Sequence, residues 1–286
     1  MNRTRLPRAV RWGNLKRIRE VFTCCRETRQ WLAVTLAYLG LRSLSYPCEL
    51  RLRSGEVLTL KERMDLIIFW LIFMHRHYPV QRLDRVIVDV GANIGLFTLY
   101  AAREAPEAHI VTIEPFPATC RSLMELVDRN RLGDRVTVLN CAVAGSSGVG
   151  AMDCAPQMPS QYRRVYSSTT VGLNANHRGD AGNAQPGDGV IVRTVTLAQA
   201  LDSAKVTNAD FVKMNIHGSE YEVLMSTPAS ALRRLKRIAV QYHDLSAEAK
   251  IGKNELFEHL RGIGFRLESD RDTRRGAGLA VFTACA

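Results

Sequence analysis

Two acidic side chains and a glycine turn occur in an order that is typical of nucleotide-binding sites. Asp89 lies near the end of an apolar, β-branched run, and the turn from Gly91 to Gly95 follows it directly. A second apolar run ends at Glu114. The glycines allow a ligand to approach the backbone closely, and an acid at the end of the next strand is placed to accept hydrogen bonds from a ribose diol. This order predicts a nucleotide or nucleoside site at one edge of a parallel sheet.

The composition of the turn favours a nucleoside that carries no phosphates. Asn93 stands where a dinucleotide-binding turn has its middle glycine, so the backbone need not admit a pyrophosphate. The carboxylate of Asp89 would also repel phosphate groups. S-adenosylmethionine is such a nucleoside, and we predict that it is the cofactor. Phe116 is expected to flank its adenine, and the segment 140–142 to meet the adenine edge. The residues of these runs that are predicted to bind the cofactor are Asp89, Gly91, Ala92, Asn93, Gly95, Glu114, Phe116, Asn140 and Ala142.

Hydrophobic patterning predicts strands that alternate with helices from residue 86 onward. Such alternation at this spacing is typical of a doubly wound α/β fold with a parallel sheet. The final two strands are expected to form an antiparallel pair. The predicted strands are 86–90, 109–113, 136–140, 190–195, 210–215, 237–243, 265–268 and 279–283, and the predicted helices are 94–104, 119–130, 220–226 and 254–263.

The chain is expected to divide into three parts. Residues 1–45 form a basic N-terminal extension, helical from residue 14. Residues 46–80 form a hairpin and an apolar helix that packs on the core. Residues 81–286 form the cofactor-binding domain. Within that domain, residues 144–189 are rich in Gly, Ser, Asn, Pro and Gln, which favours either a substrate lid or a mobile insertion, apart from a weak strand at 148–152.

Charge is concentrated at the N-terminus. The net charge is +11, and residues 1–30 hold nine Lys and Arg against two Glu, a net +7. This excess suits either a solvated helix face or an acidic partner, such as nucleic acid or an anionic membrane surface. Because the charge lies away from the predicted site, nucleic acid is the less favoured partner. An apolar helical stripe between the arginines offers a further possibility, which is oligomer formation through the N-terminal helices.

The cysteines favour a reducing compartment. The seven cysteines are scattered, odd in number and without a CxxC pair, which argues against a disulfide framework or a zinc site. The longest apolar runs, Trp31–Leu41 and Leu66–Met74, are shorter than the ~18 residues that a membrane span needs. We therefore expect a cytoplasmic protein without a bound metal.

Several segments from about Glu49 to the C-terminus together resemble the FkbM family of S-adenosylmethionine-dependent methyltransferases. The resemblance implies a Rossmann-like class I methyltransferase sheet and O-methylation, often of sugar hydroxyls or secondary metabolites. The first two motifs occur in many methyltransferases, whereas the fourth is the specific one. In order, the motifs are Val88-Asp-Val-Gly-Ala-Asn-Ile-Gly95, Ile113-Glu-Pro-Phe116, Asn140-Cys-Ala-Val143, Val212-Lys-Met-Asn-Ile-His-Gly-Ser-Glu-Tyr-Glu-Val-Leu224 and Ile238-Ala-Val-Gln-Tyr-His243.

The chain departs from the family pattern at three positions. Asn215, His217 and Gln241 stand where the family has an Asp, a Glu and a Glu. All three lie at the carboxyl ends of predicted strands, where α/β sheets bind ligands, and together they remove up to three negative charges. Three interpretations stay open: an acceptor of different charge, a lost metal or base, or an inactive enzyme. Asn215 is still predicted to contact the cofactor. The positions that fit the family are Lys213, Gly218, Glu220 and His243.

Two histidines are the candidate catalytic residues. Methyl transfer from a sulfonium requires alignment of the acceptor and often removal of its proton, and imidazole suits that step because it titrates near neutral pH. His243 ends a predicted strand, and His217 follows another. We expect His243 to accept the proton or orient the acceptor, with His217 in support.

The leading functional hypothesis is O-methylation of a small molecule, such as a sugar or secondary-metabolite hydroxyl. Two alternatives stay open. One is N- or C-methylation of a secondary metabolite, which the lost acids would allow. The other is a catalytically inactive methyltransferase fold that acts as a scaffold.

Overall fold

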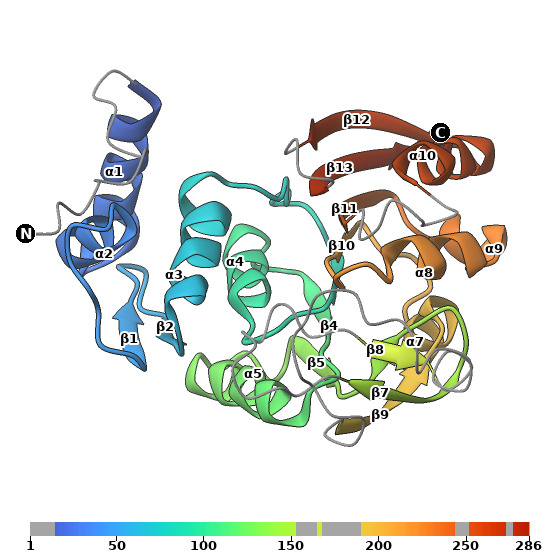
Figure 1. Ribbon diagram of the computed structural model, residues 1–286, viewed down its shortest axis with the longest axis horizontal. Helices are drawn as coiled ribbons and strands as arrows, with labels where there is room; N and C mark the ends of the chain where they lie inside the picture. The colour runs from blue at the N-terminus through green and yellow to red at the C-terminus, as the bar shows by residue number, and fades with distance from the viewer. Residues whose placement is uncertain (1–14, 153–164, 168–189, 244–251, 273–276, 286) are drawn as a thin grey trace, which may run out of the picture. The chain divides into compact units, whose positions relative to one another are not determined.

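A computed structural model describes residues 15–152, 165–167, 190–243, 252–272 and 277–285 (Figure 1). These residues fall into two compact units. The first contains residues up to 79 together with 128–131, and the second contains residues 80–127 and those from 132 onward. None of the described helices is long and apolar enough to cross a membrane.

The first unit contains two short helices, a hairpin and a third helix. The predicted hairpin is present, with Cys48 opposite Leu60 at the open end of its antiparallel ladder. Asn130 is joined to the hairpin through both the N–H and the C=O of Val57. The elements are α1 (Leu15–Glu27), α2 (Trp31–Tyr38), β1 (Cys48–Arg51), β2 (Val57–Leu60), α3 (Arg63–Phe69) and a π-helical turn, η1 (Trp70–Met74).

The prediction of one helix from residue 14 to 45 is wrong, because the first helix ends before Thr28 and a second begins at Trp31. Thr28 forms an isolated antiparallel bridge with Leu52. The N–H of Arg29 donates to the carbonyl of Arg51, and the side chain of Gln30 accepts from the N–H of Arg51. These bonds to the hairpin replace the helical hydrogen bonds. The second helix then ends before Gly40, whose φ of 74° is left-handed and favours glycine.

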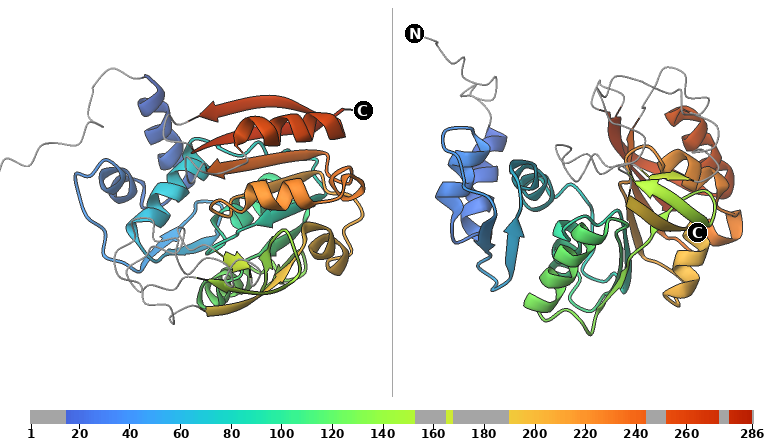
Figure 2. Two further views of the ribbon diagram at one scale, coloured as in Figure 1. Left: turned by 45° about the vertical axis from the view of Figure 1, so that its right-hand side comes forward. Right: turned by 60° about the horizontal axis from the view of Figure 1, so that its bottom comes forward.

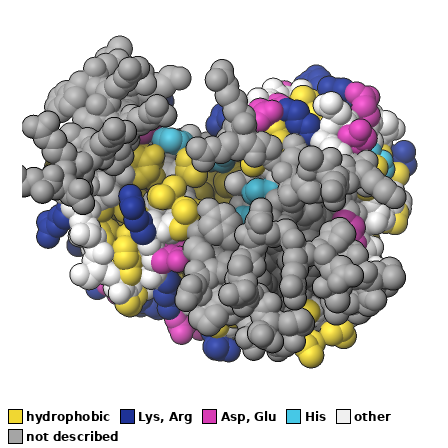
Figure 3. Space-filling model, viewed as in Figure 1, with side chains coloured by type: hydrophobic (Ala, Val, Ile, Leu, Met, Phe, Trp, Pro, Cys, Tyr) yellow, Lys and Arg dark blue, Asp and Glu magenta, His cyan; other side chains and the backbone are white. Residues whose placement is uncertain are grey.

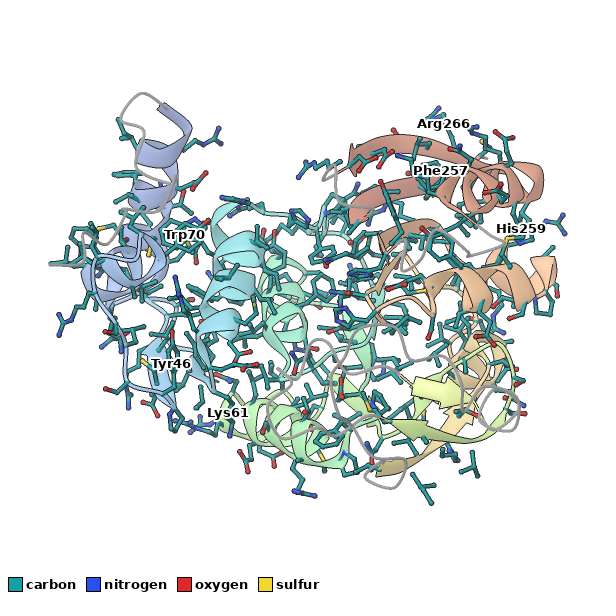
Figure 4. All side chains as sticks on the ribbon, in the orientation of Figure 1. Tyr46, Lys61, Trp70, Phe257, His259 and Arg266 are labelled. Carbon is teal, nitrogen blue, oxygen red and sulfur yellow. The ribbon has the colours of Figure 1, made fainter. Side chains whose placement is uncertain are left out.

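Trp70 is the central side chain of this unit (Figure 4). It is fully buried and stacks on Tyr38, with ring centroids 4.1 Å apart and planes 5° from parallel. Its indole N–H donates to the carboxylate of Glu20 at 3.1 Å. The apolar helix expected within residues 46–80 is α3, and a π-helical turn follows it directly after Phe69.

The second unit is built on the predicted parallel sheet, with strand order β12-β13-β11-β10-β3-β4-β5. The strands from β11 to β5 are parallel, and β13 is antiparallel to both β11 and β12. The chain runs from β3 toward one edge and returns through β10 toward the other, so the topological switch lies between β3 and β10. The doubly wound α/β fold is therefore confirmed. The strands are β3 (Val86–Val90), β4 (His109–Ile113), β5 (Val136–Leu139), β10 (Phe211–Met214), β11 (Arg237–His243), β12 (Phe265–Asp272) and β13 (Ala277–Ala284).

Helices cover both faces of this sheet (Figure 2). One side carries α4 and α5, and the other carries α8 and α10. The central strands are apolar and buried on both faces, as expected for parallel strands between helical layers. The main core joins β3, β10, β11 and β13 to α7–α10. The helices are α4 (Leu96–Glu104), α5 (Pro117–Arg129), α7 (Leu197–Ser203), α8 (Glu220–Ser226), α9 (Ala229–Leu232) and α10 (Lys253–Ile263).

The last two strands are longer than their apolar residues predicted. The polar half of β12 is held by side chains rather than by apolar burial. Tyr242 donates to Asp270 at 2.7 Å, and Lys253 pairs with both Asp270 and Asp272. Gly278 on β13 allows this arrangement, because a Cβ there would lie 2.2 Å from the Tyr242 hydroxyl.

A second, four-stranded sheet follows β5, with order β6-β9-β7-β8. Two of its strands lie within residues 144–189, and the strand expected at 148–152 is one of them. Most of the segment predicted as a lid, residues 153–164 and 168–189, lies outside the described residues. The strands are β6 (Ala142–Val143), β7 (Gly148–Met152), β8 (Val165–Ser167) and β9 (Val190–Val195).

Candidate active site

The glycine turn is fixed between the ends of β4 and β10. The amides of Gly91 and Ala92 both donate to the carbonyl of Ile113 at 3.0 Å. Gly91 has a φ of 78°, and a Cβ on it would lie 2.1 Å from the backbone oxygen of Asn215. Only glycine fits this contact. At Gly91 the missing side chain makes room for the end of β10, and the close approach of a ligand to the turn stays a prediction.

Glu114 holds the turn from the other side. Its Oε2 accepts from the N–H of Asn93 at 2.9 Å, and its Oε1 accepts from the N–H of Phe116 at 3.0 Å. Asn93 takes a left-handed φ of 52°, which aims its N–H at the acid. Burial raises the pKa of the Glu114 carboxyl to about 7, against the opposing effects of these two amides and of Lys213. Two backbone amides of this loop therefore fix the orientation of the Glu114 carboxylate, which is expected to accept hydrogen bonds from a ribose as well.

Asp89 lies deeper than Glu114. It is fully buried; its Oδ1 accepts from the ammonium of Lys213 at 2.9 Å, and its Oδ2 from the hydroxyl of Thr98 at 2.8 Å. Lys213 also donates to the carbonyl of Gly91 at 2.6 Å. The pair Asp89–Lys213 therefore joins β3 to β10 and anchors the first residue of the turn. A direct contact between Asp89 and the cofactor stays a prediction.

The residues expected to meet the adenine lie at the ends of β4 and β5. The amide of Asn140 donates to the carbonyls of Glu114 and Pro115 at 2.8 and 3.0 Å, so it fixes the loop after β4. Phe116 is partly buried and packs against the small cluster that includes Ala142. The structure thus brings all three predicted residues to one region of the carboxyl edge.

Asn215 and Gln241 form an amide pair across the ends of β10 and β11. The Nδ2 of Asn215 donates to the Oε1 of Gln241 at 3.0 Å. The Oδ1 of Asn215 is shielded from solvent and accepts no hydrogen bond from the described residues. A buried acceptor without a donor is costly, so this atom is suited to a ligand that supplies an N–H or O–H.

The two candidate histidines lie together, and a buried acid contacts one of them. Their ring centroids are 4.8 Å apart. The Nδ1 of His243 lies 3.2 Å from the Oε1 of Glu220, which has no exposed surface. Glu220 also accepts from the N–H groups of Ile216 and Gly218 at 2.8 and 2.6 Å. In the neutral imidazole, Nδ1 donates to this carboxylate, and Nε2 is the nitrogen that carries a lone pair.

His243 keeps some contact with solvent in this arrangement. Its side chain is 16% exposed, and histidine side chains are among those that reach the face drawn in Figure 3. His217 has a left-handed φ of 53°, which a tight turn after β10 requires. The imidazole at the strand end is therefore held by a buried acid on one side and is reachable on another.

Two residues of this site were not predicted as site residues. Glu220 was noted only as a match to the family motif, and Lys213 likewise. Their roles follow from contacts between segments that are far apart in the chain, which spacing alone does not give. The available signal was their shared motif, in which Lys213 lies within β10 and Glu220 begins α8.

Several known methyltransferases are similar to this chain. A family model described as the methyltransferase FkbM domain matches residues 89–267. A protein named 31-O-demethyl-FK506 methyltransferase FkbM, from Streptomyces tacrolimicus, is 27% identical over 69% of this chain and 78% of its own length. Methyltransferase sdnD from Sordaria araneosa is 26% identical over 70% of this chain and 82% of its own length.

A solved structure is also similar. The methyltransferase FkbM of Methylobacillus flagellatus KT covers 94% of this chain and 58% of its own, at 15% identity and a TM-score of 0.45.

Proposed function

Because this chain belongs to the FkbM family of methyltransferases, we propose that it binds S-adenosylmethionine at the carboxyl edge of β3, β4 and β10 and methylates a hydroxyl of a small molecule. The methyltransferase activity follows from the family. The relative from Streptomyces tacrolimicus is named as a methyltransferase of an O-demethyl compound, which supports oxygen as the acceptor atom. A sugar or a secondary metabolite is the proposed substrate class.

The observation that carries the cofactor proposal is the position of Glu114 beside the glycine turn. A nearly buried carboxylate, with each oxygen already oriented by one backbone amide, retains lone pairs for two ribose hydroxyls. Gly91, Asn93 and Gly95 all have positive φ and give the turn the tight backbone on which we propose that the nucleoside lies. The residues present therefore fit the cofactor. When bound, S-adenosylmethionine supplies an electrophilic methyl group on a sulfonium.

The proposed role of His243 is to take the proton of the acceptor hydroxyl. Glu220 holds Nδ1 and so fixes the ring orientation and the proton position. Nε2 would then accept the proton of the acceptor hydroxyl. His217, at 4.8 Å between ring centroids, supports the orientation of that ring. The orphaned Oδ1 of Asn215 accepts a hydrogen bond from the bound ligands.

Replacing Glu114 by alanine tests the cofactor site. We expect the affinity for S-adenosylhomocysteine to fall by about tenfold or more, corresponding to about 1.5–3 kcal/mol for hydrogen bonds to a charged group. Titration calorimetry measures this change. Glu125→Ala, at an exposed acid on α5, is the control and should bind as the wild type does. Unchanged affinity in Glu114→Ala would remove Glu114 from the site.

The raised pKa of Glu114 predicts that cofactor affinity depends on pH. The ribose hydroxyls need the ionised carboxylate as acceptor, and burial holds its pKa at about 7, above the ordinary value of 4.5. Between pH 8 and pH 6 the ionised fraction of such a group falls about tenfold. The affinity for S-adenosylhomocysteine should fall with it, by about tenfold. In the same titration, Glu114→Gln should bind S-adenosylhomocysteine more weakly, and its affinity should hardly change with pH. A wild-type affinity that is equally independent of pH would contradict the assignment.

A further inference from the structure

The outer face of α1 combines exposed apolar side chains with cations. Ile18 and Phe22, one helical turn apart, are 69% and 62% exposed. Arg19 and Arg26 are exposed beside them, and Arg29 follows the helix. The guanidinium of Arg26 lies 5.9 Å from the centroid of the Phe22 ring. We call these five residues the α1 outer face.

The acids of α1 point away from this face. Glu20 accepts from the indole of Trp70 and pairs with His75 at 3.1 Å, within the first unit. The Oε2 of Glu27 is likewise shielded from solvent. Cys24, fully buried, marks the inner side of the helix. The two carboxylates of α1 are thus withdrawn, and the outer face keeps its apolar residues and cations.

An anionic lipid surface matches this composition. An amphipathic helix with aromatic and aliphatic side chains beside Lys and Arg lies in the headgroup region of a bilayer. The net charge of +7 in residues 1–30 adds attraction to anionic lipids. In water, the guanidinium of Arg26 covers part of the Phe22 ring through a cation–π contact. The ring would leave this contact when it enters the apolar region of the bilayer.

The same unit holds a cavity of similar chemistry at the end of α2. Its volume is about 310 Å³, and its lining includes Arg42, Ser43, Tyr46 (Figure 4) and Arg63. Among the described residues, no carboxylate forms an ion pair with either arginine. Leu41, also in the lining, is 55% exposed. Apolar and cationic groups therefore recur together in this unit.

We propose that the α1 outer face docks the protein on anionic phospholipid membranes. Ile18 and Phe22 enter the boundary between headgroups and acyl chains, and the three arginines contact headgroup phosphates. A second copy of the chain is disfavoured as the occupant, because a two-fold dimer would bring two copies of this cation-rich face together without a carboxylate on the face to pair with them. Nucleic acid is disfavoured because phosphate contacts make no use of an exposed isoleucine and phenylalanine.

Vesicle flotation of the full-length protein tests the proposal. Vesicles of equal parts phosphatidylcholine and phosphatidylglycerol should carry the wild type, and vesicles of phosphatidylcholine alone should carry far less. The double variant Ile18→Ser/Phe22→Ser should lose binding by about tenfold or more, since each side chain buries apolar area in the boundary. Arg19→Gln/Arg26→Gln should bind more weakly and with less dependence on salt. Ile191→Ser, at an isoleucine that is 75% exposed in the other unit, should bind as the wild type does.

Other outcomes would overturn the proposal. Equal flotation of wild type and Ile18→Ser/Phe22→Ser would show that the α1 outer face does not insert. A wild-type mass by light scattering that is twice that of the double variant, without flotation, would assign the face to a second copy. A salt-sensitive shift of RNA by the wild type, without flotation, would assign the charge to nucleic acid. Circular dichroism of each variant establishes that it is folded.

Discussion

Replacing His243 by alanine is expected to lower methyl-transfer turnover by about 10²–10⁴ while cofactor affinity stays nearly unchanged. The reason is the role proposed for His243 as acceptor of the hydroxyl proton, at a position outside the glycine turn where the ribose is proposed to bind. Its Nδ1 is engaged by the buried Glu220 at 3.2 Å, so a single nitrogen remains for chemistry. Turnover is measured by the release of S-adenosylhomocysteine with an accepted substrate, and affinity is measured by calorimetry.

Two further variants make this prediction specific. His109→Ala is the control, because His109 begins β4 at the opposite edge of the sheet and bonds Thr137; its turnover should match the wild type. Glu220→Gln keeps the shape of the acid but weakens its hold on the ring. It should shift the pH profile of turnover as well as its height, which a purely structural role would not do. If His243→Ala lowers turnover less than about threefold and His217→Ala abolishes it, the two roles are reversed.

The parts of this protein that could be predicted from sequence are those set by local pattern. The strand ending near Asp89, the glycine turn and the strand ending at Ile113, just before Glu114, follow from apolar runs and from glycine's backbone freedom. The parallel sheet follows from the alternation of strands and helices. These features depend on neighbours a few residues away, so the residues themselves carry the information.

The rest depends on contacts that join distant segments. The break at Thr28 arises because residues 28–30 bond to the hairpin strand at Arg51 and Leu52. The polar half of β12 is ordered by Tyr242 and Lys253, which no local pattern indicates. The contact of Glu220 with His243 requires two strand ends to lie side by side. Each of these is a tertiary effect that overrides local propensity.

Replacing Lys213 by methionine is expected to destabilise the fold by about 3–5 kcal/mol, because it leaves Asp89 as an uncompensated buried charge. The ammonium of Lys213 and the carboxylate of Asp89 are 5% and 0% exposed, so water cannot replace the lost partner. The ammonium also donates to the carbonyl of Gly91 at 2.6 Å. The urea midpoint, followed by circular dichroism, should fall accordingly, and cofactor affinity should fall with it because the turn loses its anchor.

A matched ion pair at the surface tests whether burial or charge causes the loss of stability in Lys213→Met. Lys236 pairs with Asp210 at 2.6 Å, but its side chain is 68% exposed, so Lys236→Met should cost no more than about 1 kcal/mol. The double variant Lys213→Met/Asp89→Leu removes both charges and should recover most of the lost stability, since apolar side chains of similar volume often replace a buried ion pair without loss. If it recovers stability but not cofactor affinity, the pair serves the turn as well as the fold. If Lys213→Met is as stable as Lys236→Met, then Asp89 is not buried as a charge, and the anchoring role of this pair is wrong.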